Sequence, residues 1–397
     1  MIIFFAALYL LIQPVGAEEF LYKHQEGDKY RILSTVQEDV YINNMLIRRV
    51  EILNRISAEV ISVSEGKGRH RAVFQTSERI IEDTPMAGMS YRWAREYSSE
   101  FERDRLGRLT IDREYIMPVV RDVPVFPGRD LQPGDKWSEA GEEVHDFREI
   151  GIKDPYRIPF IANYTFLGDR EWKGKMYPAF SVNYEIRSTP AAIRGSVYPR
   201  RIIAKSNQIV YWDSNLGQPF AYTETFQHRL EFSNGVIFEF KGEAEAEIKE
   251  SERMDKERIA EEIAETIESL NIQDVSVRVA DEGIIISLDD IQFQANTTVM
   301  LPGEKEKLDK IVGILLNYRE RDILVGGHTA LADTEEARQK LSVERASVIA
   351  EYIIGQGGRT PDRVVVRGYG SERPIADNRT EEGMRKNRRV EITILEN

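Results

Sequence analysis

The stretch VGGHTALADTEEARQKLSVERA (residues 325–346) predicts a strand, a short polar loop and a helix in succession. The strand is 322–327, an apolar run that ends in two glycines, and such glycines predict close backbone packing at the strand end. The helix covers 334–354. This order of elements is typical of a ligand-binding loop, yet a small apolar residue, Ala330, directly follows the tripeptide Gly-His-Thr.

The residues around this stretch alternate between strand and helix patterns. Apolar residues at helical spacing predict two further helices, and short apolar runs predict four further strands. The helices are expected at 304–318 and 380–384, and the strands at 275–279, 283–288, 363–368 and 388–395. This order predicts an α+β sandwich with the helices on one face of the sheet, and we assign it to residues 283–397.

Residues 251–282 precede this domain and are rich in Glu. Ile259, Ile263 and Ile267 recur at helical spacing, so one face of the predicted helix is apolar. An acidic run can also serve as an interaction tail, but the periodic isoleucines favour an ordinary amphipathic helix. We assign 251–282 to a linking segment that contains this helix and a strand.

Residues 18–250 follow a period of two and are predicted to form a β-rich domain. In 48–63 apolar and charged residues alternate, which predicts a strand with one buried and one exposed face. The segments on either side of 233–235 also alternate, and their apolar stripes face the same side only if these three residues form the turn. Such a turn places Leu230 opposite Phe238.

Regular spacing extends over the rest of this region, which predicts an all-β sandwich or an open barrel. The Pro- and Gly-rich segment 123–137 is predicted to be a surface connection. A membrane-spanning barrel is disfavoured because residues 91–109 carry charges at both odd and even positions, whereas a lipid-facing strand needs an apolar band. Further strands are predicted at 30–42, 69–80, 158–167, 177–187 and 207–213.

The N-terminus predicts export from the cytoplasm. Residues 2–12 form an unbroken apolar run, and small residues before position 18 fit a signal-peptidase site, so we assign 1–17 to a signal peptide. The run is shorter than the ~20 apolar residues of a membrane-spanning helix. No basic residue precedes it, and a buried N-terminal strand is the alternative. We expect a periplasmic protein of a double-membrane bacterium, with no transmembrane segment after signal cleavage.

The composition disfavours several classes of function. A net charge of −13 argues against binding to nucleic acid, because phosphate contacts need clustered Lys and Arg. The five histidines are scattered, and the sequence contains neither a Gly-x-Ser-x-Gly motif nor a phosphate-binding glycine loop. The sequence therefore predicts no metal, no cofactor and no enzymatic activity. The ligand of the β-rich domain stays open, with another envelope protein as a candidate partner.

Five motifs follow one another in the C-terminal domain: IQFQANTTVML (291–301), GGHTA (326–330), LSVERA (341–346), VRGYGSERPIADNRT (366–380) and NRRVEI (387–392). Together they resemble the OmpA-like domain, the peptidoglycan-associating module of OmpA, Pal and MotB type proteins. The resemblance covers about 283–397 and implies the fold of that module. The N-terminal region resembles no family that we recognise.

The resemblance implies non-covalent binding to the stem peptide of peptidoglycan. The family module holds a diamino acid, usually diaminopimelate, whose free end carries an ammonium and a carboxylate. It does so with an Asp directly after Gly-His-Thr and an Arg in the motif Leu-Ser-x-x-Arg-Ala. By position the Arg is Arg345, and the Asp would be residue 330. The resemblance also implies ligand-binding positions at Asn296, Thr329, Asn387 and Arg388.

The chain departs from the family at two positions. Ala330 replaces the Asp, and Arg338 stands where the family usually has Asn, so the site loses one negative charge and gains one positive charge. Arg338 and Arg345 share one face of the predicted helix. A charge-assisted hydrogen bond contributes ~1.5–3 kcal/mol, so loss of the Asp predicts roughly 10- to 100-fold weaker binding of the ammonium end.

Two alternatives preserve binding. Asp333 can approach the ammonium, although Asp333 and Glu336 also fit a capping box at the start of the helix. Alternatively, the pocket binds a carboxylate alone, from a stem peptide or from a partner protein. We interpret His328 as a structural residue rather than a ligand contact.

The sequence as a whole predicts a periplasmic envelope protein whose C-terminal domain associates with peptidoglycan, with weakened or altered recognition of the diamino acid. The alternative function is an envelope scaffold whose OmpA-like domain no longer binds diaminopimelate and instead docks a protein or another anionic group.

Overall fold

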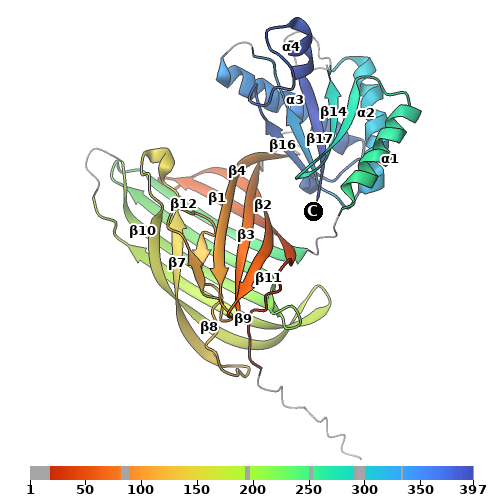
Figure 1. Ribbon diagram of the computed structural model, residues 1–397. Coiled ribbons are helices and arrows are strands. Elements are labelled where there is room, and N and C mark those ends of the chain that lie inside the picture. The colour runs from red at the N-terminus through yellow and green to blue at the C-terminus, as the bar shows by residue number, and fades with distance from the viewer. Residues whose placement is uncertain are drawn as a thin grey trace, which may run out of the picture.

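The chain forms a large curved sheet followed by a smaller domain of helices and strands (Figure 1). The computed structural model describes residues 18–81, 90–192, 197–249, 254–289, 291, 300–331 and 334–396. The predicted signal peptide, Asn296 and Asp333 lie outside these residues. Within the described ranges, no helix combines the length and the apolar character needed to cross a membrane.

The N-terminal sheet is built from twelve consecutive strands of the described chain, each antiparallel to its neighbours. Its strands are β1 (Lys29–Ile42), β2 (Met45–Ser64), β3 (Lys67–Ile80), β4 (Tyr91–Arg103), β5 (Leu109–Ile111), β6 (Val120–Arg121), β7 (Lys136–His145), β8 (Tyr156–Trp172), β9 (Lys175–Ser188), β10 (Pro199–Asp213), β11 (Gln218–Phe232) and β12 (Ile237–Lys249). Because β1 pairs with both β2 and β12, the two runs of strands join into one layer. The all-β prediction is confirmed.

The turn between β11 and β12 confirms the predicted register. The N–H of Phe232 donates to the carbonyl of Val236 at 2.9 Å, and Leu230 lies opposite Phe238. Gly235 has a φ of 85°, a conformation that glycine adopts without a steric penalty. The three-residue turn therefore keeps both apolar stripes on the inner face of the sheet.

The prediction for 123–137 is only partly confirmed. Residues 128–130 and 132–134 are exposed in an irregular connection, but Val125, Phe126 and Leu131 are 0–1% exposed and fill one end of the curved sheet. The ring of Phe126 packs against Trp212 with centroids 4.8 Å apart. Proline and glycine in this segment indicate an irregular backbone, but its apolar side chains decide the location.

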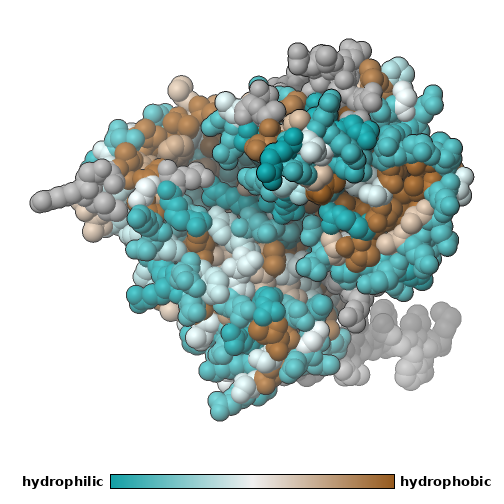
Figure 2. All heavy atoms as spheres, turned by 45° about the horizontal axis from the view of Figure 1, so that its top comes forward, coloured by the Kyte–Doolittle hydropathy of each residue, from teal (hydrophilic) through white to brown (hydrophobic). Residues whose placement is uncertain are grey.

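Several strand predictions were incomplete. Strand β10 begins at Pro199, eight residues before the predicted 207–213, and β4 and most of β7 cover segments to which no strand was assigned. Strand β4 and the start of β10 carry many charged residues, which weakens the alternating pattern. Hydrophilic side chains cover most of the face of the molecule shown in Figure 2.

The C-terminal domain has the predicted α+β architecture. Its elements are α1 (Lys256–Ser269), β13 (Val275–Ala280), β14 (Gly283–Asp289), α2 (Pro302–Leu315), β15 (Ile323–Gly327), α3 (Glu335–Gly355), β16 (Val364–Gly368), α4 (Glu381–Asn387) and β17 (Arg389–Leu395). The strands lie in the order β13-β14-β17-β15-β16, with β15 and β16 parallel. One apolar cluster joins α1, α2 and α3 to alternate residues of the strands, so these helices share one face of the sheet.

A buried ionic junction connects the two parts of the chain. Asp322, just before β15, accepts hydrogen bonds from Arg31 Nη2 of β1 and Arg55 Nε of β2, both at 2.9 Å. All three side chains are at most 10% exposed. Next to this junction β16 pairs with the start of β4, where Val365 lies opposite Tyr91. The two sheets are therefore continuous through backbone hydrogen bonds.

Replacement of Asp322 by Ala should loosen the junction. The variant leaves Arg31 and Arg55 buried without their carboxylate, and breaking a buried ion pair costs about 3–5 kcal/mol. We expect a lower thermal unfolding midpoint and faster proteolysis between the domains. The control is Asp39→Ala, which removes a more exposed pair with Arg49 and should cost less than about 1 kcal/mol. Equal losses in the two variants would contradict a structural role of the junction.

Acid should weaken the same junction. Burial alone would raise the pKa of Asp322, but Arg55 and Arg31 outweigh burial and hold that pKa below its usual range. Because the folded-state pKa is depressed, the stabilisation is complete above the unfolded-state value of about 3.9 and is lost as the pH falls through the folded-state value. The free energy of unfolding of the native chain should therefore approach that of Asp322→Asn on acidification. A constant difference at all pH values would refute this assignment.

Candidate functional site

Close packing of backbone segments positions the loop after β15. A Cβ at Gly327 would collide with the Ser342 carbonyl oxygen on α3, and a Cβ at Gly368 would collide with the Ser342 side chain. Ser342 Oγ also accepts from the Gly370 N–H at 3.0 Å, and the Thr329 N–H donates to the Gly370 carbonyl at 2.8 Å. The glycines therefore allow β15, β16 and α3 to meet at one edge of the sheet.

His328 stabilises this loop through buried contacts. It is 2% exposed, its ring stacks on Tyr369 at 4.8 Å, and its Nε2 lies 3.4 Å from Glu391 Oε2. Arg389 Nε donates to the other carboxylate oxygen of Glu391 at 2.8 Å. Burial opposes ionisation of Glu391, but His328 and Arg389 outweigh burial and hold its pKa well below the usual range. The carboxylate is thus committed to internal partners.

The cationic side of the site comes from α3 and from the residue after α4. Arg345 is half-buried in the middle of α3, and burial, followed by the charge of Arg388, lowers its pKa. Arg338 is half-buried two helical turns before Arg345. A half-buried guanidinium beside another positive charge favours an anionic ligand, because screening by water is reduced there.

The loop itself, at Thr329 and Ala330, offers few polar groups to a ligand. Ala330 is 5% exposed and its methyl group offers no hydrogen-bond acceptor. Thr329 is 6% exposed, and among the described residues its Oγ1 has no hydrogen-bond partner. A buried hydroxyl in this state favours occupation of the loop by a ligand or water.

The side chain of Asn387 supports two neighbouring loops through hydrogen bonds. Its Oδ1 accepts from the N–H groups of Ile375 and Ala376 at 2.8 and 3.0 Å, and its Nδ2 donates to Asn378 Oδ1 at 2.9 Å. Asn378 Oδ1 in turn accepts from the Leu331 N–H at 3.1 Å. Through these hydrogen bonds, the fully buried Asn387 links the 328–331 loop to the loop before α4.

The start of α3 differs from its prediction. The N-cap is Thr334, whose side chain accepts from the Ala337 N–H at 3.3 Å. The capping box assigned to Asp333 and Glu336 is therefore wrong by one residue. Both Thr and Asp are good N-caps, and the sequence alone did not separate these adjacent candidates.

A contact from the N-terminal sheet was missed by sequence reasoning. The guanidinium of Arg367 lies 4.4 Å from the ring of Trp93 on β4 and 4.8 Å from the ring of Tyr369. Tyr369 stacks on His328, so a continuous set of ring contacts runs from β4 to the loop. Nothing in the spacing of these residues along the chain indicates the contact.

The described residues contain no group of three or more His, Cys, Asp or Glu side chains suited to a metal ion. The site can therefore be described from its arginines, its hydroxyl group and its backbone. These groups suit non-covalent recognition of a carboxylate or another anion.

Comparison with known proteins supports the C-terminal assignment. A sequence model of the OmpA family matches residues 292–388, which leaves the N-terminal sheet outside the match. Outer membrane porin F of Pseudomonas fluorescens is 32% identical over 105 residues, which are 26% of this chain and 32% of that protein. The peptidoglycan-binding protein ArfA of Mycobacterium tuberculosis is 33% identical over 104 residues, 26% of this chain and 32% of that protein. The chain thus spans about a third of the length of these two relatives.

A shorter relative matches over most of its length. The outer-membrane lipoprotein YfiB of Pseudomonas aeruginosa is 33% identical over 124 residues, which are 31% of this chain and 73% of that protein. This similarity agrees with the family match and with the order of strands and helices described above. Through its C-terminal domain, the chain belongs to the OmpA family.

Proposed function

We propose that this chain is a periplasmic protein of the cell envelope whose C-terminal domain associates non-covalently with peptidoglycan. Membership of the OmpA family supports this function, as does the similarity to a protein named for peptidoglycan binding. The single observation that carries the proposal is the half-buried Arg345 beside Arg388, on the helix that packs against the end of β15. Among the described residues, the buried Thr329 hydroxyl in the loop after β15 has no hydrogen-bond partner.

The proposed recognition depends on the carboxylate of the ligand. A guanidinium can donate two parallel hydrogen bonds to a carboxylate, and Arg345 lies where burial strengthens such a contact. Arg388 and Arg338 add positive charge on the same side. Ala330 supplies no acceptor for an ammonium group, so the ammonium of a diamino acid gains little at this site. The affinity for stem peptides is then weaker than that of a site with both charges.

Substitution of Arg345 by Ala should reduce co-sedimentation with isolated peptidoglycan sacculi. Loss of a charge-assisted contact of about 1.5–3 kcal/mol corresponds to roughly 10- to 100-fold lower affinity. The control is Arg379→Ala, which removes the same charge from a side chain that is 91% exposed on the same domain. If the native chain stays in the supernatant, or if both variants sediment like the native chain, the proposal fails.

Substitution of Ala330 by Asp should strengthen the same association. The new carboxylate restores an acceptor for the ammonium of diaminopimelate, with an expected gain of roughly 10- to 100-fold. Ala330→Asn controls for the size of the side chain and should produce no such gain. Because residue 330 is buried, thermal unfolding of each variant must show that the domain stays folded. A folded Ala330→Asp protein with unchanged affinity would show that the ammonium does not bind near residue 330.

A further inference from the structure

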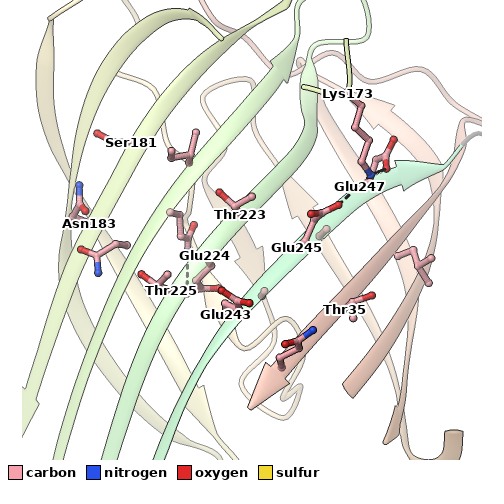
Figure 3. Close-up of a pocket in the computed structure, with 17 residues that line it drawn as sticks. Thr35, Lys173, Ser181, Asn183, Thr223, Glu224, Thr225, Glu243, Glu245 and Glu247 are labelled. Carbon is pink, nitrogen blue, oxygen red and sulfur yellow. Dashed lines mark hydrogen bonds and ion pairs between the residues drawn. The ribbon is translucent and has the colours of Figure 1, made fainter. Parts of the chain in front are cut away.

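A polar groove of about 810 Å³ lies on the outer face of the N-terminal sheet, away from the arginine site (Figure 3). At one end the tip of the β8–β9 hairpin folds over this face, because Trp172 packs with Tyr211 at 4.8 Å. Lys173 on this tip pairs with Glu245 at 3.0 Å and with Glu247 at 2.7 Å. On the same side of the groove, Leu33 lies opposite Glu247 on β12 and opposite Arg55 on β2, and Arg55 binds Asp322.

The strand register aligns the lining side chains into a row across the strands. Each member lies directly opposite the next on a neighbouring strand, and all project from the same face of the sheet. Neighbouring strands are about 4.8 Å apart, so the row repeats at that interval. The row consists of Gln37, Glu243, Thr225, Asn207 and Asn183 within the groove, and it continues to Asn163 and Ser138 on the next two strands.

The side chains of this row are available to a ligand. Gln37, Glu243, Thr225, Asn207 and Asn183 are all exposed. In the part of the chain that the structure describes, none of these five side chains makes a hydrogen bond or an ion pair with another protein group. A second, parallel row beside it consists of Thr35, Glu245, Thr223, Ile209 and Ser181, of which Ile209 is apolar.

The functional groups of these side chains indicate which class of ligand the row can bind. Amide, hydroxyl and carboxylate groups at regular intervals suit a polymer that carries a hydroxyl or amide group on every unit. The acidic residues disfavour an anionic polymer, and the small number of apolar side chains disfavours a lipid. An extended peptide presents alternate residues about 6.8 Å apart, which does not match a spacing of about 4.8 Å. The ring of a polysaccharide unit is comparable in length to one strand spacing.

We propose that this groove binds an extended, uncharged polysaccharide chain that lies across strands β1, β12, β11, β10 and β9. The proposal stands apart from the arginine site, because it concerns sugar units and not a stem peptide. Leu33, on the Lys173 side of the groove, adjoins Arg55 of the domain junction, so a glycan bound in the groove lies near that junction.

The test is calorimetric titration of the whole mature chain with chitohexaose, cellohexaose and hexalysine. The variant is Asn183→Ala combined with Asn207→Ala, two exposed residues whose side chains make no hydrogen bonds to the described protein groups, and thermal unfolding checks its fold. The control is Lys205→Ala, on the same exposed face of β10 but outside the groove. Loss of two hydrogen bonds should weaken binding of the hexasaccharide by about tenfold or more.

The outcomes separate this proposal from the proposed function. Binding of a hexasaccharide that is weakened by the double variant, but not by Lys205→Ala or Arg345→Ala, supports the glycan groove. Binding of chitohexaose without cellohexaose further assigns the ligand to N-acetylated sugars. The proposal is overturned if neither sugar binds, if the double variant binds as tightly as the native chain, or if hexalysine binds more tightly than both sugars.

Discussion

The burial of Asp322 between Arg31 and Arg55 is the interaction on which the arrangement of the whole chain depends. A carboxylate at this depth is stable only with both guanidinium groups in place, because an unpaired buried charge is costly. The ion pairs fix the start of β15 against β1 and β2, and the same strand ends in the loop of the arginine site. The pairing of β16 with β4 adds backbone hydrogen bonds to this junction. The arginine site and the polar groove therefore belong to one connected sheet.

Under the two proposals, the arginine site and the groove recognise different chemical groups. The C-terminal site places the positive charges of Arg345 and Arg388 near a loop in which residue 330 is an alanine, which suits a carboxylate. The groove presents uncharged polar groups and carboxylates at the spacing of β-strands, which suits sugar units. A cell wall polymer contains both kinds of group, in its peptides and in its glycan strands. Weak binding at each site gives a much higher combined affinity when both sites contact the same polymer.

Features that depend on local sequence could be predicted, whereas features that depend on contacts between distant residues could not. The β11–β12 turn was predictable because the parity of Leu230 and Phe238 is a local property. The buried part of 123–137 was missed because Pro and Gly indicate an irregular backbone but not burial, which Phe126 gains through distant partners. The ring contacts of Trp93 with Arg367 join residues far apart in the chain, and no pattern identifies them. Motif resemblance located Arg345 and Ala330, but the hydrogen bonds that occupy Asn387 became visible only in the fold.

The central claim is that the C-terminal site recognises a carboxylate and has lost recognition of an ammonium. The most direct measurement is the affinity of the chain for a diaminopimelate-containing stem peptide in two blocked forms. Acetylation of the free amine should change the affinity by no more than about twofold, whereas amidation of the free carboxylate should weaken it by at least about tenfold. The opposite order, with the amine essential and the carboxylate dispensable, would contradict the account.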